Sequence, residues 1–152
     1  GADLCTIEEA KDFMAEVPEK IPFMGTSCCP AWSVMAKKMF PQFENCISMA
    51  LTPMVLTARL LKQQEPECKI VFVGPCAAKK LEASRKSIRS YVDFVLTFEE
   101  VKGMFDAKNV DFSSIPEEEP LTQASSDGRG FAASGGVAAA VVKAVKRMDP
   151  ER

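Results

Sequence analysis

A continuous apolar run at residues 70–73, with the sequence Ile-Val-Phe-Val, constrains the fold of this chain more than any other segment. An unbroken run of this kind is typical of a strand that is buried on both faces, as in a parallel sheet. The residues at 74–76, Gly-Pro-Cys, end the run. Further strands are predicted at residues 21–27 and 92–96, and helices alternate with them. The pattern predicts an α/β fold, with a small, mainly parallel sheet flanked by helices.

Capping patterns and prolines mark where the helices start and stop. Thr6 and Glu9 fit a capping box at the start of one helix, and Thr97 with Glu100 fits a second. Pro30 suits the first turn of another helix. Helices are predicted at residues 7–17, 30–40, 53–63, 77–90, 98–107 and 137–148, with a long loop at residues 109–130.

Length and composition indicate an ordinary globular chain. It has 152 residues, of which 47% are hydrophobic and 26% charged, enough for one domain with a buried core. Its net charge of -2 gives no basis for binding nucleic acid or an anionic membrane surface. No apolar run approaches the roughly 20 residues of a membrane span, and the N-terminal residues do not resemble a signal peptide. We expect a cytoplasmic protein with neither nucleic acid nor a membrane as partner.

The chain has no histidine, although it has six cysteines. The missing histidine excludes, within this chain, a Ser-His-Asp triad, a Cys-His pair and zinc sites of mixed ligands. Disulfides are possible with an even number of cysteines, but the chain is neither short nor secretory in character, which favours reduced thiols. Some thiols are then candidates for soft-metal ligands and others for small buried residues. The cysteines are Cys5, Cys28, Cys29, Cys46, Cys68 and Cys76.

Two of these cysteines follow predicted strands and directly precede predicted helices. Cys29 and Cys76 occupy these positions, and ligands of parallel α/β sheets bind beyond the carboxyl ends of the strands. Thiolates are soft donors that suit iron–sulfur clusters or copper(I). The alternative is that both are buried structural cysteines. Two ligands alone do not complete an iron–sulfur cubane or a structural zinc site, each of which needs four.

The motifs around these cysteines resemble those of a known family. Residues 26–32, Thr-Ser-Cys-Cys-Pro-Ala-Trp, resemble the first signature of the [FeFe]-hydrogenases, T-S-C-C-P-x-W. Residues 75–82 resemble the second signature, M-P-C-x-x-K-x-x-E, with Gly74 in place of the methionine. Residues 131–137 are similar to the family's F-G-A-T-G-G-V. The similarity spans nearly the whole chain, and it implies one lobe of the iron-only hydrogenase catalytic domain.

The resemblance implies a role for each matching residue. The metal ligands would be Cys29 and Cys76, two of four thiolates that hold the H-cluster, a [4Fe–4S] cubane linked to a two-iron subcluster with CO and cyanide ligands. Lys79 would face an iron-bound cyanide, and Glu82 would support the local structure or the relay entrance. Proton transfer would involve Cys28, Ser48, Glu9 and Asp12. The cofactor pocket would be lined by Pro53, Pro75, Lys79, Phe131 and Glu82.

Plainer interpretations of several of these residues stay open. Glu9 fits a capping box equally well, and Ser48 fits an ordinary loop serine. Phe131 is a candidate for core packing. The glycines at 135–136 are interpreted as close backbone packing, because no phosphate-binding motif surrounds them.

Several features of the family are absent from this sequence. The third signature, which supplies the other two cysteine ligands, is not reached before Arg152, and the ferredoxin-like cluster domains are also absent. Met54 stands where the family has glutamine, and with Gly74 this is similar to the divergent sensory branch. We therefore expect residues 1–152 to be a single partial domain that by itself binds no complete cofactor and is inactive. The expected partners are the remainder of the hydrogenase chain and a ferredoxin-like electron donor or acceptor.

Two functions from different classes follow. The first is an oxidoreductase that reversibly reduces protons to H2, or a sensor of H2. The second is a non-catalytic relative similar to the cytosolic iron–sulfur assembly proteins, and the presence of Cys28 favours the first because those relatives tend to lack this cysteine. A thiol redox module built on Cys28 and Cys29 is the weakest hypothesis, because adjacent cysteines form a strained disulfide.

Overall fold

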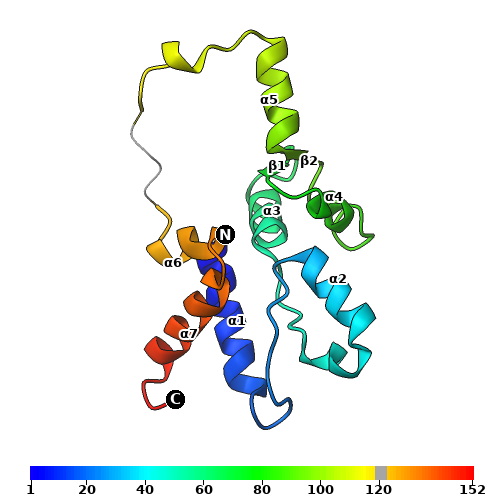
Figure 1. Cartoon of the computed structure of the whole chain (residues 1–152), viewed down its shortest axis with the longest axis vertical. Coiled ribbons are helices and arrows are strands. Elements are labelled where there is room, and N and C mark those ends of the chain that lie inside the picture. The colour runs from blue at the N-terminus through cyan, green and yellow to red at the C-terminus, as the bar shows by residue number, and fades with distance from the viewer. Residues whose placement is uncertain (119–122) are drawn as a thin grey trace. The chain divides into compact units, whose positions relative to one another are not determined.

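The computed structural model describes residues 1–118 and 123–152, which fall into two compact units (Figure 1). The first unit is Gly1–Thr57 with Gln123–Arg152, and the second is Ala58–Thr122. The first contains α1 (Ala2–Glu16), α2 (Pro30–Met39), α6 (Ser126–Arg129), α7 (Gly136–Met148) and 3₁₀ turns at Pro41–Cys46 and Gly130–Ala132. The second contains β1 (Val71–Gly74), α4 (Ala78–Ala83), β2 (Phe94–Thr97), α5 (Phe98–Ala107) and a 3₁₀ turn at Phe112–Ser114, and α3 (Pro53–Gln64) contributes to both. None of the described helices is both long and apolar enough to cross a bilayer.

Small side chains form the core of the first unit, where α1 packs against α7. Ala10 of α1 and Ala144 of α7 are buried, with Val141 and Val145 beside them. Alanines let two helices approach closely, and the larger Phe13 flanks the contact. This packing fixes α1, and with it the face of α1 that carries the acidic residues discussed below.

The start of α7 depends on glycine. Gly135 has a φ of 74°, in the left-handed region that glycine adopts without strain. A Cβ atom at Gly136 would overlap the carbonyl oxygen of Gly130. The predicted helix at 137–148 is confirmed, and so is the interpretation of Gly136 as close backbone packing. Gly135 is needed for its positive φ instead, since a Cβ atom there would meet open space.

The predicted capping box at Thr6 and Glu9 is wrong. Helix α1 begins at Ala2, so both residues lie within the helix. The Thr6 hydroxyl donates to the carbonyl oxygen of Ala2 at 3.0 Å, as serine and threonine do inside helices. The carboxylate of Glu9 is therefore available for another contact.

The predicted strand at residues 21–27 is also wrong. In this segment only Gly25 makes a strand-like contact, a parallel bridge to Ile47. The N–H of Gly25 donates to Cys46 at 2.7 Å, and the N–H of Ser48 donates to Gly25 at 2.9 Å. Pro22 has no N–H to extend the ladder, and glycine weakens it further.

The second unit contains a two-stranded parallel sheet, which confirms the predicted α/β class. Strands β1 and β2 pair in register from Val71 opposite Phe94 to Gly74 opposite Thr97. Asp93 fixes the entry to this pair, since its carboxylate accepts from the N–H of Ile70 at 2.8 Å. That hydrogen bond is the largest cause that lowers the pKa of Asp93 to about 2, followed by contacts with Lys62 and Lys69.

Two expectations for this unit need correction. The apolar run does not form a strand buried on both faces, because Val71 and Val73 are 50% and 46% exposed. The helix expected at 77–90 ends at Ala83, and the hydroxyl of Ser84 then donates to the carbonyl of Leu81 at 2.8 Å. Serine competes in this way with the helical hydrogen bonds. The second predicted capping box, by contrast, is confirmed at the start of α5.

Candidate functional site

Cys29 lies at the N-cap position of α2, where an extended backbone meets the helix. Its sulfur accepts a hydrogen bond from the backbone N–H of Trp32 at 3.4 Å. Pro30 occupies the first turn and is buried, and the indole N–H of Trp32 donates to Thr26 at 3.0 Å. These contacts hold an exposed thiol at the N-terminal end of a helix.

Cys76 occupies the corresponding place in the second unit, between β1 and α4. It is exposed, and its carbonyl accepts from the N–H of Lys79 at 3.2 Å. The alternative that Cys29 and Cys76 are buried structural cysteines is therefore wrong, whereas Cys5 and Cys46 are buried. Two exposed thiols at helix starts fit the soft-donor chemistry of an iron–sulfur cluster. No group of three or more cysteine or carboxylate side chains forms a metal site within residues 1–118 and 123–152.

Cys28 is half-buried on the turn that leads into α2. The neighbouring Ser27 ties this turn to the segment before α3, because its hydroxyl donates to the carbonyl of Ala50 at 3.0 Å. The backbone of Ser27 also lowers the pKa of the Glu9 carboxyl. The turn that carries both cysteines therefore lies close to Glu9 of α1.

Glu9 and Ser48 meet in the interior of the first unit. Their exposed fractions are 5% and 6%, and Ser48 lies close enough to the Glu9 carboxyl to lower its pKa. The second carboxylate oxygen, Oε1, is buried without a hydrogen-bond partner among the described atoms. Burial is the largest cause that raises the pKa of Glu9, and the charge of Asp12 raises it further. The hydrogen bonds from Ser48 and Ser27 act in the opposite direction. Glu9 is thus a buried carboxyl that retains its proton more readily than an exposed one.

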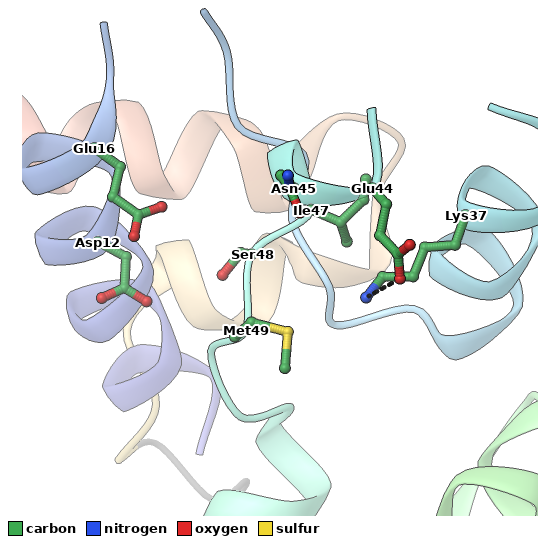
Figure 2. A pocket seen from close by; sticks show the side chains of 8 residues that line it. All are labelled: Asp12, Glu16, Lys37, Glu44, Asn45, Ile47, Ser48 and Met49. Atoms are coloured by element: carbon green, nitrogen blue, oxygen red, sulfur yellow. Dashed lines mark ion pairs between the residues drawn. The ribbon is translucent and has the colours of Figure 1, made fainter. Parts of the chain in front are cut away.

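A pocket of about 440 Å³ lies beside this pair, within the first unit (Figure 2). Figure 2 shows Asp12 and Glu16 projecting from α1 toward the segment that carries Ser48. The pKa of Asp12 is raised, first by burial and then by the charges of Glu16 and Glu8. The polar lining of the pocket consists of Asp12, Glu16, Lys37, Glu44, Asn45 and Ser48.

Sequence reasoning did not identify Glu16, Lys37 or Glu44. None of them lies in a family motif, and Lys37 and Glu44 come from α2 and the 3₁₀ turn that follows it. The one available signal was helical spacing, since Glu16 lies four residues after Asp12 and therefore on the same face of α1. The sequence pattern gave no reason to prefer that face.

Lys79 and Glu82 form a largely buried ion pair in α4. Lys79 Nζ lies 2.7 Å from Glu82 Oε2, and the Glu82 side chain is 3% exposed. Because Lys79 is one helical turn from Cys76, the pair fixes an ammonium group close in sequence to a candidate metal ligand. The neighbouring Lys80 points elsewhere and pairs with Glu100 at 2.8 Å. Of the two lysines, Lys79 is the more buried, with a side chain that is 14% exposed against 42% for Lys80.

The remaining predicted pocket residues lie at the ends of elements. Pro53 begins α3 and is half-buried, Pro75 follows β1 and is exposed, and Phe131 is half-buried in the 3₁₀ turn before α7. The structure places Asp12 and Ser48 in the lining of one pocket, and the buried Glu9 lies against Ser48. The binding roles of Pro53, Pro75 and Phe131 stay predictions.

Comparison with known protein families gives a match over almost the whole chain. A family model described as "Iron only hydrogenase large subunit, C-terminal domain" matches residues 1–151. Iron hydrogenase 1 of Clostridium pasteurianum is 31% identical over 162 aligned residues, which cover 96% of this chain and 28% of that protein. The cytosolic Fe-S cluster assembly factor NAR1 of Kluyveromyces lactis is 35% identical over 102 residues, which cover 67% of this chain and 22% of that protein.

Solved structures agree with this similarity. The [FeFe]-hydrogenase HydA(deltaEFG), whose structure concerns stepwise H-cluster assembly, aligns with a TM-score of 0.73 and 28% sequence identity. The alignment covers 96% of this chain and 40% of that protein. The expected α/β fold of a hydrogenase lobe is confirmed, and the chain spans less than half the length of the relatives it matches.

Proposed function

This chain belongs to the iron-only hydrogenase family, in the C-terminal domain of the large subunit, and from that membership we propose that it supplies part of a site that interconverts protons and H2. In the whole protein the reaction is 2H⁺ + 2e⁻ ⇌ H2. The chain's share is two thiolates, Cys29 and Cys76, together with a route for protons. The remaining two thiolates come from the rest of the hydrogenase chain, and a ferredoxin-like protein donates or accepts the electrons.

The observation that carries this proposal is that Ser48 lies against the buried Glu9 and lowers the pKa of its carboxyl. The family resemblance assigns both residues to one proton relay, although they belong to segments that are distant in the sequence. Ser48 also offers a polar neighbour to a carboxylate whose burial costs free energy. A relay needs this arrangement, because a hydroxyl can accept one proton and donate another.

Cys29 and Cys76 are the residues that would hold the cluster, and their exposed sulfurs at helix starts suit it. When bound, the cluster supplies the metal centre and the electrons for the reaction. Cys28 would give and take a proton at its sulfur. Glu82 holds the ammonium group of Lys79, which would supply a cation and hydrogen-bond donor to the anionic ligands of the bound cluster.

A second candidate is supported by the similarity to NAR1. In that case the whole protein holds an iron–sulfur cluster, and binds partner proteins, without turning over H2. The presence of Cys28, next to the ligand Cys29, favours hydrogenase chemistry, because a metal site without proton transfer needs only the second thiol.

The whole protein that carries this chain tests both candidates when it is reconstituted anaerobically. Hydrogenase function gives H2 evolution from reduced viologen, together with infrared bands of metal-bound CO and cyanide. A cubane absorption spectrum without these bands and without H2 establishes the second candidate instead. The 152-residue chain alone, with two of four thiolates, retains neither stoichiometric iron nor the infrared bands, and their presence in it would contradict the assignment of two ligands.

A further inference from the structure

The segment that follows α4, residues 84–91, contains three basic residues and no acidic one (Figure 1). The three are Arg85, Lys86 and Arg89, and all of them are exposed. None makes an ion pair with a carboxylate in the described part of the chain. We call this segment the basic turn. Its charge of +3 contrasts with the net charge of -2 of the whole chain.

The cations of α4 itself do not add to this charge, because carboxylates neutralise them. Lys79 pairs with Glu82 at 2.7 Å, and Lys80 pairs with Glu100 at 2.8 Å. The unneutralised positive charge of this region is therefore concentrated on the basic turn.

Hydrogen bonds and one buried side chain fix the shape of the basic turn. The carbonyl oxygen of Arg85 accepts from the N–H of Ile88 and from that of Arg89, both at 2.9 Å. The side chain of Ile88 is buried and anchors the turn to the second unit. At the end of the turn, Arg59 Cζ lies 4.9 Å from the centroid of the Tyr91 ring. The three cations are thus presented from an ordered backbone, which lowers the entropy lost when a partner binds.

An exposed apolar side chain precedes these cations. Leu81 of α4 is 62% exposed, and it comes four residues before Arg85. The hydroxyl of Ser84 donates to the carbonyl of Leu81 at 2.8 Å, which ties the end of α4 to the start of the turn. Protein interfaces combine apolar contacts with a polar rim, and arginine is enriched in them. This surface therefore suits a protein partner that carries negative charge.

Helix α4 connects the basic turn to a candidate cluster ligand. Cys76 is exposed and lies two residues before α4. The helix has six residues and is therefore about 9 Å long. Electron transfer is faster over shorter distances, so a partner on the basic turn is well placed to exchange electrons with a cluster that Cys76 helps to hold.

We propose that the basic turn is the docking site of a small acidic electron-transfer protein, whose carboxylates face Arg85, Lys86 and Arg89. The electron-transfer role rests on the proposed function, whereas the docking itself does not. In each encounter the reduced partner is oxidised by one electron, which passes to the cluster, and two encounters supply the two electrons of one H2. Complexes of this kind bury little surface and form through complementary charge, so their affinity falls as salt is added.

Two exposed lysines of the second unit allow a matched comparison. Lys86→Glu reverses a charge in the basic turn, and Lys108→Glu reverses one at the end of α5. Lys108, like Lys86, is exposed and makes no ion pair within residues 1–118 and 123–152. Arg89→Glu adds a second reversal to Lys86→Glu, whereas Arg89→Lys retains the charge. Substitutions at exposed positions such as these have little effect on stability.

Surface plasmon resonance with a [4Fe–4S] ferredoxin of strongly negative net charge measures the docking on the whole protein. At low salt the double variant, Lys86→Glu with Arg89→Glu, binds the ferredoxin about tenfold more weakly than the wild type, since repulsion replaces attraction. Lys108→Glu and Arg89→Lys bind as the wild type does. The difference disappears at about 1 M salt, where charges are screened beyond about 3 Å. Equal affinity of the double variant and the wild type at low salt, or an equal loss in Lys108→Glu, overturns the proposal.

A short DNA duplex is the second probe, because it carries negative charge without an apolar contact surface. We expect it to bind the wild type more weakly than the ferredoxin does. Binding of the duplex that is as tight as that of the ferredoxin would identify a general site for polyanions, and it would overturn the assignment to an acidic protein.

H2 evolution by the whole protein tests how the docking is used. With the reduced ferredoxin as donor, the double variant evolves H2 several-fold more slowly than the wild type. With reduced methyl viologen, a small donor that needs no docking surface, the two proteins evolve H2 at the same rate. Equal rates with the ferredoxin, or an equal loss with both donors, overturn the electron-transfer role. If neither donor gives H2 while ferredoxin binding still depends on Lys86 and Arg89, the proposed function fails and the docking site stands.

Discussion

Ser48 lies against the carboxyl of Glu9 and lowers its pKa, and both side chains are buried. The contact joins α1 to the segment that follows the 3₁₀ turn Pro41–Cys46. Ser48 also accepts a hydrogen bond from the N–H of Ala50 at 3.0 Å. That hydrogen bond holds the serine beside a carboxyl whose pKa is raised mainly by burial.

Replacing Ser48 tests this orientation. Ser48→Ala removes a hydrogen bond that favours the ionised carboxylate, so the pKa of Glu9 rises further, as carboxyl NMR can measure. Loss of the hydroxyl costs about 1 kcal/mol of stability, and H2 turnover of the whole protein falls by about 10²-fold. Ser48→Thr retains the hydroxyl and serves as the control. Equal Glu9 titration in the wild type and Ser48→Ala would contradict the assigned contact.

The raised pKa of Glu9 predicts how stability depends on pH. The folded chain keeps this proton above the ordinary pKa of 4.5, so the folded state binds more protons than the unfolded state as pH rises through that value. The free energy of unfolding therefore decreases as the pH rises from 4.5 to the raised pKa of Glu9. Glu9→Gln makes this fall smaller, and Asp12 retains its own part. Urea unfolding between pH 4 and 8 measures the slope, with Glu19→Gln as the control, and an unaltered slope in Glu9→Gln contradicts the prediction.

The ion pair in α4 is expected to be strongly coupled. Glu82→Gln leaves the ammonium group of Lys79 without its buried carboxylate and costs about 3 kcal/mol of stability. Adding Lys79→Met recovers part of the loss, because the uncompensated charge is then removed. The exposed pair of Lys102 and Asp106 is the control, and Asp106→Asn costs roughly 0.5 kcal/mol or less. Additive losses in the Lys79 and Glu82 double-mutant cycle would show that the pair is not coupled.

Asp93 predicts a different behaviour at acid pH. Its pKa lies at about 2 in the folded chain, below its ordinary value of 3.8, mainly because of the N–H of Ile70. This stabilisation is present above pH 3.8 and is lost as pH falls through about 2. Asp93→Asn removes this acid-dependent loss of stability. If wild type and variant lose stability identically as the pH is lowered, the prediction is contradicted.

Local sequence patterns predicted structure correctly where no earlier helix start was available. Thr97 and Glu100 form the predicted capping box because the strand β2 ends at that point. The identical pattern at Thr6 and Glu9 failed, because α1 already starts at Ala2 and buries both side chains. A capping pattern identifies residues that can cap a helix, but it does not determine the residue at which the helix begins.

The contacts of the site were less accessible to sequence reasoning. The resemblance named Glu9, Ser48 and Asp12 separately, but only the packing of α1 against the segment before α3 places Asp12 and Ser48 in one pocket, with Glu9 against Ser48. Glu16 belongs to no motif, and only the structure places it in this pocket. Strand β1 was expected to be buried on both faces. The expectation failed because an apolar pattern does not specify which elements cover the strand.

The most direct test of the central claim is H2 turnover of the whole protein with Cys28 replaced by alanine. Cys68→Ala is the matched control, since Cys68 is a half-buried thiol outside both signatures. The account predicts that Cys28→Ala lowers turnover by about 10²–10⁴-fold while the CO and cyanide infrared bands persist, and that Cys68→Ala leaves turnover unchanged. Turnover in Cys28→Ala equal to that of Cys68→Ala, with the infrared bands intact, would contradict the account.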